Sequence, residues 1–285
     1  MYNKDKKSRM KALVSILALV MILTSSPVHA FASKVKRPKI SAKTAIIMDM
    51  DSGRVLYGKK RYAKRNQASI TKLMTVTLAA ENNSPSAKFT INKTVSKVKF
   101  SRFPMKVGDS WTVEDLSYGA MLPSSNGCAS ALAIKTSGSQ KAFIKKMNKK
   151  AKALGCKHTH YANPHGLPSG NHYTCAYDTA LILRYAYNNE TVRKYMGTRK
   201  WTAKTLKKHQ TIHMRNTNKL LGKYNGVMGG KTGTTSLAGN CIATVYQYKG
   251  HRYAVVVLGS SSGKKRLSDS RKLYRFIRAK VNQAN

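Results

Sequence analysis

The chain has 285 residues, of which 53 are lysine or arginine and only 10 are aspartate or glutamate, so its formal charge is +43. This length suffices for one large hydrophobic core or two small ones. A charge of this size is usual in proteins that bind nucleic acid, but here the basic residues are spread along the whole chain instead of forming one stripe. Together with the N-terminal pattern described next, this distribution predicts that nucleic acid is not a partner.

Residues 1–32 have the pattern of a signal peptide. Five basic residues precede the short apolar run 12–23, and Ala30 and Ala32 offer a cleavage site. The run is short for a membrane span, so we expect cleavage and an exported protein, with an uncleaved anchor as the alternative. Loss of residues 1–32 would lower the formal charge from +43 to +39. A polycation at the cell wall or the outer face of the cytoplasmic membrane is expected to bind anionic wall polymers or the membrane surface.

Strand patterns occur at both ends of the remaining chain, and helix patterns lie between them. Turn residues join the strands into an early hairpin and a late one. Residues 86–111 are irregular and basic, with short strand-like pieces such as 89–91. Residues 161–170 are rich in proline and glycine and are expected to be a loop. The elements expected in chain order are strands at 44–48 and 54–57, helices at 69–82, from 112 toward 123, from 126 to 137, at 140–154 and at 178–187, strands at 226–233, 239–248 and 253–258, and a helix at 268–281.

This order predicts an α+β fold. The strands at the two chain ends would form one antiparallel sheet flanked by helices, with a helical lobe inserted between them. The run 255–257 consists of three valines, which indicates a strand buried on both faces. The closing helix is basic and amphipathic, with Leu273, Phe276 and Ile277 expected to face the sheet. Residues 33–285 would be a single domain.

The stretch that singles out a chemistry is the start of the helix at 69–82, where Ser69 and Lys72 lie three positions apart. Residues i and i+3 share a helix face, so the two side chains can touch. A serine hydroxyl becomes a useful nucleophile when a neighbouring base takes its proton, and a buried lysine can be that base. The spacing alone is weak, because it recurs at five other serines: Ser8, Ser33, Ser96, Ser261 and Ser262.

Two further motifs follow Ser69 in a meaningful order. Ser124-Ser125-Asn126 comes at a turn that opens a helix, and Lys231-Thr232-Gly233 lies on a predicted strand. The set Ser-x-x-Lys, Ser-x-Asn and Lys-Thr-Gly is the signature of penicillin-recognising serine acyl enzymes. The three motifs are expected to meet in a cleft where sheet and helical lobe join.

The chain resembles the D-alanyl-D-alanine carboxypeptidases, the low-molecular-weight penicillin-binding proteins, over roughly residues 40–282. The resemblance also includes Asp51-Ser52-Gly53, Leu154-Gly155, Asn163-Pro164-His165-Gly166-Leu167, Tyr177-Asp178, Asn216-Thr217-Asn218 and Ala238-Gly239. It implies removal of the terminal D-alanine from peptidoglycan stem peptides, covalent inhibition by β-lactams, and no cofactor.

The resemblance also assigns the acylation residues. Ser69 would be the acylated nucleophile and Lys72 its base. Ser124 would relay a proton to the leaving D-alanine, and Asn126 would bind the substrate amide and steady Lys72. The positive charge of Lys231 near Lys72 would lower the pKa of Lys72 by repulsion.

The same resemblance assigns the substrate-binding strand. Lys231 and Thr232 would hold the substrate carboxylate, and Gly233 would leave room for the peptide along the strand. The oxyanion hole would be formed by the backbone N–H groups of Ser69 and Thr234.

The sequence departs from the family pattern at four residues. Gln67 stands where a proline is usual, and Cys175 replaces a hydroxyl residue before Ala-Tyr-Asp. Gly127 and Cys128 follow Asn126 where an aspartate is common, so we expect a looser helix there. The chain also ends about 50 residues after the Lys-Thr-Gly motif. The C-terminal β-rich domain and amphipathic anchor of many relatives are therefore expected to be missing, which puts membrane attachment in doubt.

Three rival functions stay open. A class A β-lactamase needs a glutamate that activates the deacylating water, and between the second and third motifs only Asp178 and Glu190 are acidic. Neither fits the expected Glu-x-x-x-Asn pattern, so this alternative is weaker. A DD-endopeptidase of the same superfamily would carry the same motifs. A non-catalytic cationic wall-binding protein is opposed by the intact set of Ser69, Lys72 and Lys231.

Histidines and cysteines suggest neither a metal site nor one disulfide pattern. Four histidines lie close in sequence, but no acidic ligand or His-Glu-x-x-His motif accompanies them, so we expect no metal. The histidines are His158, His160, His165 and His172. Four cysteines allow three pairings, and free buried thiols are an equal alternative. The cysteines are Cys128, Cys156, Cys175 and Cys241.

Overall fold

The structure is a computed structural model that describes residues 35–205 and 211–284. By its internal contacts the chain divides into residues 1–36 and residues 37–285, and every described helix and strand belongs to the second unit. The signal peptide predicted for residues 1–32 lies outside the described residues. No helix in the described ranges combines the length and the apolar character that a membrane crossing requires.

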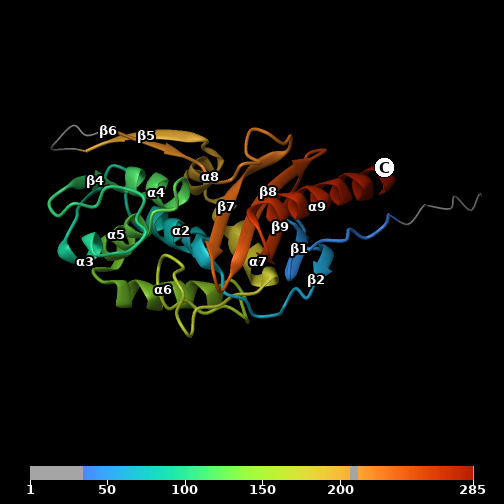
Figure 1. Cartoon of the computed structure of the whole chain (residues 1–285), viewed down its shortest axis with the longest axis horizontal. Helices are drawn as coiled ribbons and strands as arrows, with labels where there is room; N and C mark the ends of the chain where they lie inside the picture. Colours follow the sequence, from blue (N-terminus) through green and yellow to red (C-terminus); the bar gives the residue numbers. More distant parts are fainter. Residues whose placement is uncertain (1–34, 206–210, 285) are drawn as a thin grey trace, which may run out of the picture. The chain divides into compact units, whose positions relative to one another are not determined.

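A five-stranded antiparallel sheet is built from both ends of the chain, as the strand pattern predicts. Its strand order is β2-β1-β9-β8-β7. Figure 1 shows the blue strands β1 and β2 beside the red and orange strands β9, β8 and β7. Gly53 turns the first hairpin with a φ of 77°, a conformation that suits glycine. The strands are β1 (Thr44–Asp49), β2 (Val55–Lys59), β7 (Val227–Thr235), β8 (Gly239–Tyr248) and β9 (His251–Ser260).

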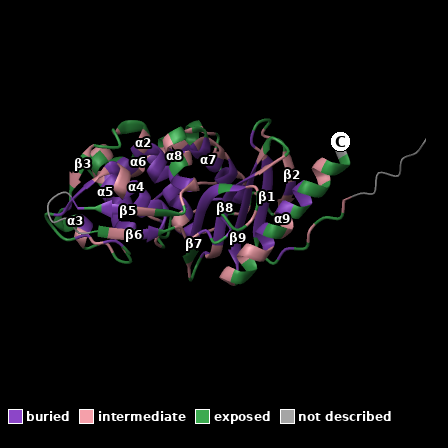
Figure 2. Cartoon of the chain, turned by 90° about the horizontal axis from the view of Figure 1, so that it is seen from above, coloured by how far each residue is buried: buried purple, intermediate pink, exposed green. Residues whose placement is uncertain are grey.

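Helices cover both faces of this sheet. Residues 255–257 of β9 are fully buried, as the three valines predict, and successive strand residues point to opposite faces. The closing helix α9 (Gly263–Ala284) buries Leu273 and Ile277 against β8 and β9. Helix α7 (Ala176–Asn188) packs against β1, β8 and β9 and joins the core of the helical region. In Figure 2 the strands are largely buried, whereas α9 presents exposed residues on its outer side.

The remaining helices form the predicted helical region between β2 and β7. They begin and end at residues suited to those positions. Thr112 accepts a hydrogen bond from the backbone N–H of Asp115 at 3.0 Å, and Gly138 ends a helix with a φ of 73°. Besides α7, the helices are η1 (Ala68–Thr71), α2 (Lys72–Asn82), α3 (Lys93–Ser96), α4 (Val113–Met121), α5 (Asn126–Ser137), α6 (Gln140–Ala153) and α8 (Glu190–Gly197).

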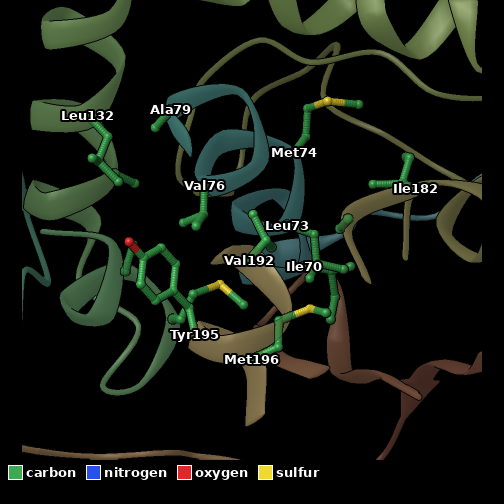
Figure 3. Close-up of a cluster of buried hydrophobic side chains, with 14 of the residues drawn as sticks. Ile70, Leu73, Met74, Val76, Ala79, Leu132, Ile182, Val192, Tyr195 and Met196 are labelled. Atoms are coloured by element: carbon green, nitrogen blue, oxygen red, sulfur yellow. The ribbon is translucent and has the colours of Figure 1, made fainter. Parts of the chain in front are cut away.

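Helix α2 lies at the centre of the helical region. Residues 72–79 are all buried, because α2 contacts α4, α5, α7 and α8. A helix buried on every side has no polar stripe, and each buried Leu, Met or Val stabilises the fold by about 1.5–3 kcal/mol. Figure 3 shows this packing, with Leu132 of α5, Ile182 of α7 and the α8 side chains Val192, Tyr195 and Met196 around α2. A lysine in such a helix is costly unless its amine finds partners.

Several elements differ from the sequence prediction. Helices α3 and α8 and two short hairpins are added, of which only β3 lies at a strand-like piece that the sequence predicts, at 89–91. Helix α9 begins at Gly263 instead of Ser268. The strands of these hairpins are only 3 to 5 residues long, so their apolar pattern is weak. In β5, Trp201 stacks on Tyr118 of α4 at 4.0 Å between ring centroids. The hairpins pair β3 (Lys88–Thr90) with β4 (Ser110–Thr112) and β5 (Lys200–Lys204) with β6 (Thr211–Arg215).

All four cysteines are free thiols in the structure. Cys175 has a specific task, because its sulfur accepts a hydrogen bond from the backbone N–H of Asp178 at 3.3 Å and thereby caps α7. The thiol thus takes the capping position that a hydroxyl residue would fill.

Candidate active site

A cleft of about 580 Å³ lies where the sheet meets the helical region. Residues from all three sequence motifs line it: Ser69 from the first, Ser124 and Asn126 from the second, and Thr232, Gly233 and Thr234 from the third. The two motif lysines are buried beneath them. The structure therefore brings together every residue of the predicted site.

Ser69 is held at the entrance of α2 by an unusual backbone. It lies in η1, a 3₁₀ turn, and not in the first turn of the α-helix as the sequence predicts. The preceding residue, Ala68, has a φ of 48°, a left-handed conformation that is rare for a residue with a side chain. Such backbone strain is stored where a structure must hold a group in one place.

The amine of Lys72 makes three contacts in the protein interior. Its Nζ lies 2.9 Å from Ser69 Oγ, 2.8 Å from Asn126 Oδ1 and 2.7 Å from the backbone oxygen of His165. The amide and backbone oxygens can only accept hydrogen bonds. A neutral amine would donate its two protons to them and point its lone pair at the hydroxyl of Ser69. The geometry therefore suits a base that takes the proton of Ser69.

Asn126 joins this base to the loop on the other side of the cleft. Its Oδ1 accepts from Lys72, and its Nδ2 donates to the backbone oxygen of Lys99 at 3.0 Å. Both ends of the amide are thereby used, so the side chain is fixed in one orientation.

Ser124 contacts the second lysine and not the first. Lys231 Nζ donates to Ser124 Oγ at 2.9 Å and to the backbone oxygen of Thr232 at 3.1 Å. Ser124 itself has a φ of 67°, so the turn before α5 also holds a hydroxyl residue in the left-handed region.

The environment lowers the pKa of both lysines. Burial, followed by the positive charges of Lys231 and Arg102, lowers the pKa of Lys72 well below 10.5. Burial, followed by Arg266 and Arg102, lowers the pKa of Lys231 to about 7. Burial and the cationic neighbours thus make Lys72 a better proton acceptor than an exposed lysine would be.

The third motif contributes a strand that touches the nucleophile. A Cβ on Gly233 would come within 2.9 Å of the backbone nitrogen of Ser69, so only glycine lets β7 approach η1 this closely. The sequence prediction placed the need for glycine on the substrate side. Thr232 Oγ1 lies 2.7 Å from Thr217 Oγ1, and Thr234 Oγ1 lies 3.2 Å from Asn240 Oδ1.

Comparisons with known proteins agree with this geometry. A profile of peptidase family S11, D-alanyl-D-alanine carboxypeptidase, matches residues 31–262. The chain belongs to this carboxypeptidase family. It is 34% identical to the D-alanyl-D-alanine carboxypeptidase DacF of Bacillus subtilis over 279 residues, which cover 94% of this chain and 71% of DacF. It is 37% identical to the D-alanyl-D-alanine carboxypeptidase of Streptomyces strain K15 over 261 residues, 86% of this chain and 90% of that protein.

The fold comparison gives the same result. The crystal structure of the Streptomyces K15 DD-transpeptidase matches with a TM-score of 0.80 at 33% identity, covering 85% of this chain and 98% of the other. The predicted resemblance to the carboxypeptidase family and the predicted fold class are thereby confirmed.

The structure adds a cation that sequence reasoning missed. Arg266, in the first turns of α9, lines the cleft and donates to the backbone oxygens of Gly233 and Cys241 and to Thr234 Oγ1 at 3.2–3.3 Å. Within the described residues no carboxylate lies within ion-pair distance of Arg266. No local pattern marks this residue, because it is one arginine in a chain with 53 basic residues.

Two loops also frame the cleft of this family member. The loop after α3 contributes Phe100 and Arg102, and the loop before α7 contributes Gly166 and Leu167. Phe100 is 73% exposed although it is a large apolar side chain, and it lines the cleft. The motif that contains Gly166 supports the family resemblance, but its position at the cleft does not follow from the sequence alone.

The departures in the second motif do not loosen its helix. Helix α5 begins at Asn126 and is capped by Ser125, whose Oγ accepts from the backbone N–H of Cys128 at 3.2 Å. A Cβ on Gly127 would lie 2.7 Å from Ser101 Oγ, so glycine here lets the loop after α3 pack on the helix. The expectation of a looser helix was wrong.

The four clustered histidines do not converge. Across the described ranges, no group of three or more His, Cys, Asp or Glu side chains is placed to hold a metal ion. His165 and His172 are largely buried, and burial lowers the pKa of each, to about 3 and about 4 respectively. Both rings are therefore neutral at working pH.

Proposed function

We propose that this chain removes the terminal D-alanine of peptidoglycan stem peptides through an acyl-enzyme on Ser69. The observation that carries the proposal is the position of Lys72, which is fully buried with its Nζ 2.9 Å from Ser69 Oγ and its other two partners limited to accepting. Membership of the carboxypeptidase family supplies the reaction type.

Acylation follows from this arrangement. Lys72 takes the proton of the Ser69 hydroxyl while Ser69 Oγ attacks the carbonyl carbon between the two D-alanines. The negative charge that develops on the carbonyl oxygen is stabilised by the backbone N–H groups of Ser69 and Thr234. The bond to the terminal D-alanine then breaks as its nitrogen takes, through the Ser124 hydroxyl, the proton that Lys72 accepted, so Lys72 is neutral again for the hydrolysis step. Lys231 contacts the Ser124 hydroxyl and holds it in place.

Recognition of the substrate's free carboxylate is assigned to three groups on one side of the cleft. Lys231 and Thr232 come from β7, and Arg266 comes from α9. Arg266 has a half-buried guanidinium without an acidic partner among the described residues, so a carboxylate in the cleft would give it one. The terminal carboxylate of a peptide and the carboxylate of a penicillin are chemically equivalent here.

The positions of the acidic residues disfavour a β-lactamase. Asp178 is buried away from the cleft, where its Oδ2 accepts from the His158 N–H at 2.6 Å and from Thr159 Oγ1 at 2.9 Å. Glu190 is 89% exposed and pairs with Arg193. No acidic side chain is among the described residues that line the cleft. Hydrolysis of the acyl-enzyme is therefore assigned to Lys72 acting on a water molecule.

Product analysis tests the proposal against the endopeptidase alternative. We expect a stem pentapeptide that ends in D-Ala-D-Ala to lose one alanine, with free D-alanine released, while a cross-linked dimer without a terminal D-Ala-D-Ala stays intact. Mass spectrometry of both reactions gives the answer. Cleavage of the dimer without release from the pentapeptide would make the protein an endopeptidase. No reaction with either peptide or with penicillin would favour the wall-binding alternative.

We further propose that the protein is exported and held at the wall by its charge. The sequence pattern of residues 1–32 supports export, and helix α6 offers a suitable basic surface. Four of its lysines are exposed along one side and form no ion pair with described residues: Lys141, Lys145, Lys149 and Lys152. Such a stripe attracts a polymer that carries repeated phosphate groups.

Salt should release the protein from walls that bear teichoic acid. Exposed charges are screened beyond about 8 Å at physiological ionic strength and beyond about 3 Å at 1 M salt, so bound protein should elute as salt rises. Exchange of the four α6 lysines for glutamine should lower the eluting salt concentration, whereas exchange for arginine should not. Retention in the membrane fraction at high salt would instead indicate an uncleaved N-terminal anchor.

A further inference from the structure

The peptide group between Ala68 and Ser69 is fixed through its oxygen. The hydroxyl of Thr71 donates a hydrogen bond to the backbone oxygen of Ala68 at 2.8 Å. A trans peptide group is planar, with its C=O and N–H pointing in opposite directions. Whatever fixes the oxygen of Ala68 therefore fixes the direction of the Ser69 N–H.

A buried histidine completes the chain of hydrogen bonds. His172 Nδ1 accepts from the backbone N–H of Ala162 at 3.0 Å, so the ring proton must be on Nε2. His172 Nε2 lies 2.8 Å from Thr71 Oγ1. Because the single proton of the Thr71 hydroxyl is used on Ala68, this hydroxyl accepts from His172. The order is thus Nε2–H to hydroxyl to carbonyl.

These groups are shielded from water, which makes their hydrogen bonds directional and costly to lose. Thr71 is fully buried, and Ala68 and His172 are each 2% exposed. In such surroundings hydrogen bonds in series polarise one another, so donation to the Ala68 oxygen makes the Ser69 N–H a stronger donor. Burial, with contributions from His160 and Lys72, lowers the pKa of His172 to about 4, which keeps the required neutral ring.

Two glycines close the peptide group in from either side. A Cβ on Gly166 would lie 1.9 Å from the oxygen of Ala68, and a Cβ on Gly233 would lie 2.9 Å from the nitrogen of Ser69. The loop before α7 and strand β7 thus pack against the peptide group on both sides. They leave no room for Ala68 to leave its left-handed backbone conformation.

We propose that Thr71 and His172 are positioning residues that hold the Ser69 N–H as a donor of the oxyanion hole. The inference rests on the proposed function, which gives this N–H its role. Neither side chain touches the substrate. Both act through the Ala68–Ser69 peptide group, and the relay they form reaches from the loop before α7 to the nucleophile.

The test compares Thr71→Val with Thr71→Ser. Valine keeps the shape of threonine and removes the hydroxyl, whereas serine keeps the hydroxyl. Loss of one oxyanion donor costs about 10²–10³-fold in rate, so a misdirected donor should slow acylation by penicillin about 10–100-fold in Thr71→Val. Thr71→Ser should retain most of the wild-type rate. His172→Asn, which still accepts from Ala162 but is too short to reach Thr71, should fall between them.

A matched control separates this role from general stability. Thr77 lies in α2, which follows η1 directly, is buried like Thr71, and donates its hydroxyl to the Leu73 backbone oxygen at 2.7 Å. Thr77→Val therefore removes the same kind of hydrogen bond away from the cleft and should leave acylation unchanged at a similar cost in melting temperature.

A second readout distinguishes positioning from structural damage. For a boronic acid that forms a tetrahedral adduct with Ser69, we expect the affinity of Thr71→Val to be lower than that of the wild type. The factor should equal the one by which acylation is slowed. A peptide whose scissile amide is reduced to an amine has no carbonyl oxygen and should bind unchanged.

Each outcome has one meaning. If wild-type protein is acylated at Ser69 but Thr71→Val matches it, or if Thr71→Ser loses as much as Thr71→Val, the positioning role is wrong while the proposed function stands. If the wild-type protein is not acylated at all, the proposed function itself has failed. Should Thr71→Val not fold, the comparison of Thr71→Ser with His172→Asn decides, since equal rates in these two variants would overturn the inference.

Discussion

Ser69→Ala is expected to lower the rate of D-alanine release by about 10⁴-fold or more. Removal of the nucleophile of a serine acyl enzyme leaves only the contributions of binding and the oxyanion hole. Ser124 cannot replace it, because its hydroxyl contacts Lys231, whereas Lys72 contacts the hydroxyl of Ser69. A chromatographic assay of D-alanine released from a stem pentapeptide measures the effect.

The matched control is Ser261→Ala. Ser261 has the same Ser-x-x-Lys spacing, toward Lys264, but it is exposed at the start of α9. Its exchange should leave turnover unchanged. Ser69→Ala should also melt close to the wild-type temperature, because Ser69 is only partly buried and alanine favours helical turns. An equal loss of turnover in both variants would contradict the role of Ser69, because the exposed Ser261 shares only the Ser-x-x-Lys spacing with it.

Lys72→Arg is expected to slow acylation by penicillin by about 10²–10⁴-fold, the usual contribution of general base catalysis. The guanidinium of arginine stays protonated at any working pH, so it cannot take the proton of Ser69. Lys72→Met, which fills similar space without a charge, should lose as much, because it lacks a base altogether. Stopped-flow measurement of acylation at several penicillin concentrations separates the rate constant from binding.

The pH profile gives the same residue a second signature. The amine of Lys72 acts as a base only when neutral, so the acylation rate should fall as pH falls through its lowered pKa. This acid limb should be absent from the residual activity of Lys72→Arg. On the alkaline side, Lys231, with a pKa of about 7, loses the charge that attracts the carboxylate, so the apparent affinity should weaken as pH rises. A near-normal rate in Lys72→Arg would contradict general base catalysis by this residue.

The sequence contains enough information for the sheet and the main helices because their signals are local. Residues 255–257 are three consecutive valines in a short apolar run, which predicts a buried strand. Thr112 and Asp115 form a helix start whose hydrogen bond lies within the segment itself, so it needs no tertiary contact. The three motifs could be placed in one cleft because their order along the chain is that of the penicillin-recognising serine acyl enzymes. Strand pairing alone does not bring them together, since β7 and β2 are the two opposite edges of the sheet.

Elements defined by tertiary contact could not be predicted in this way. The hairpin of β5 and β6 exists because Trp201 stacks on Tyr118, a residue far away in sequence. Arg266 reaches the cleft because α9 begins at Gly263, five residues earlier than the sequence predicts, so that its side chain contacts the backbone oxygen of Gly233 in β7. In a chain with 53 basic residues, no local pattern distinguishes Arg266 from the others.

The relay behind the nucleophile shows the same limit most clearly. Thr71 follows Ser69 by two positions, yet its task depends on His172, a hundred residues away, and on a backbone conformation at Ala68 that no sequence pattern announces. The sequence pattern places His172 only among four neighbouring histidines and predicts no role for it. Its hydrogen bonds give it a different place, as part of the support of the candidate site.

The most direct test of the central claim is intact-mass measurement of the protein after exposure to a penicillin, followed over time beside D-alanine release on the same preparation. We expect a single adduct that maps to Ser69 and lasts for minutes or longer, because no acidic residue in the described cleft activates water against the bulky penicilloyl ester. D-Alanine should meanwhile be released with turnover. An adduct on another residue, or rapid penicillin hydrolysis without D-alanine release, would contradict the account.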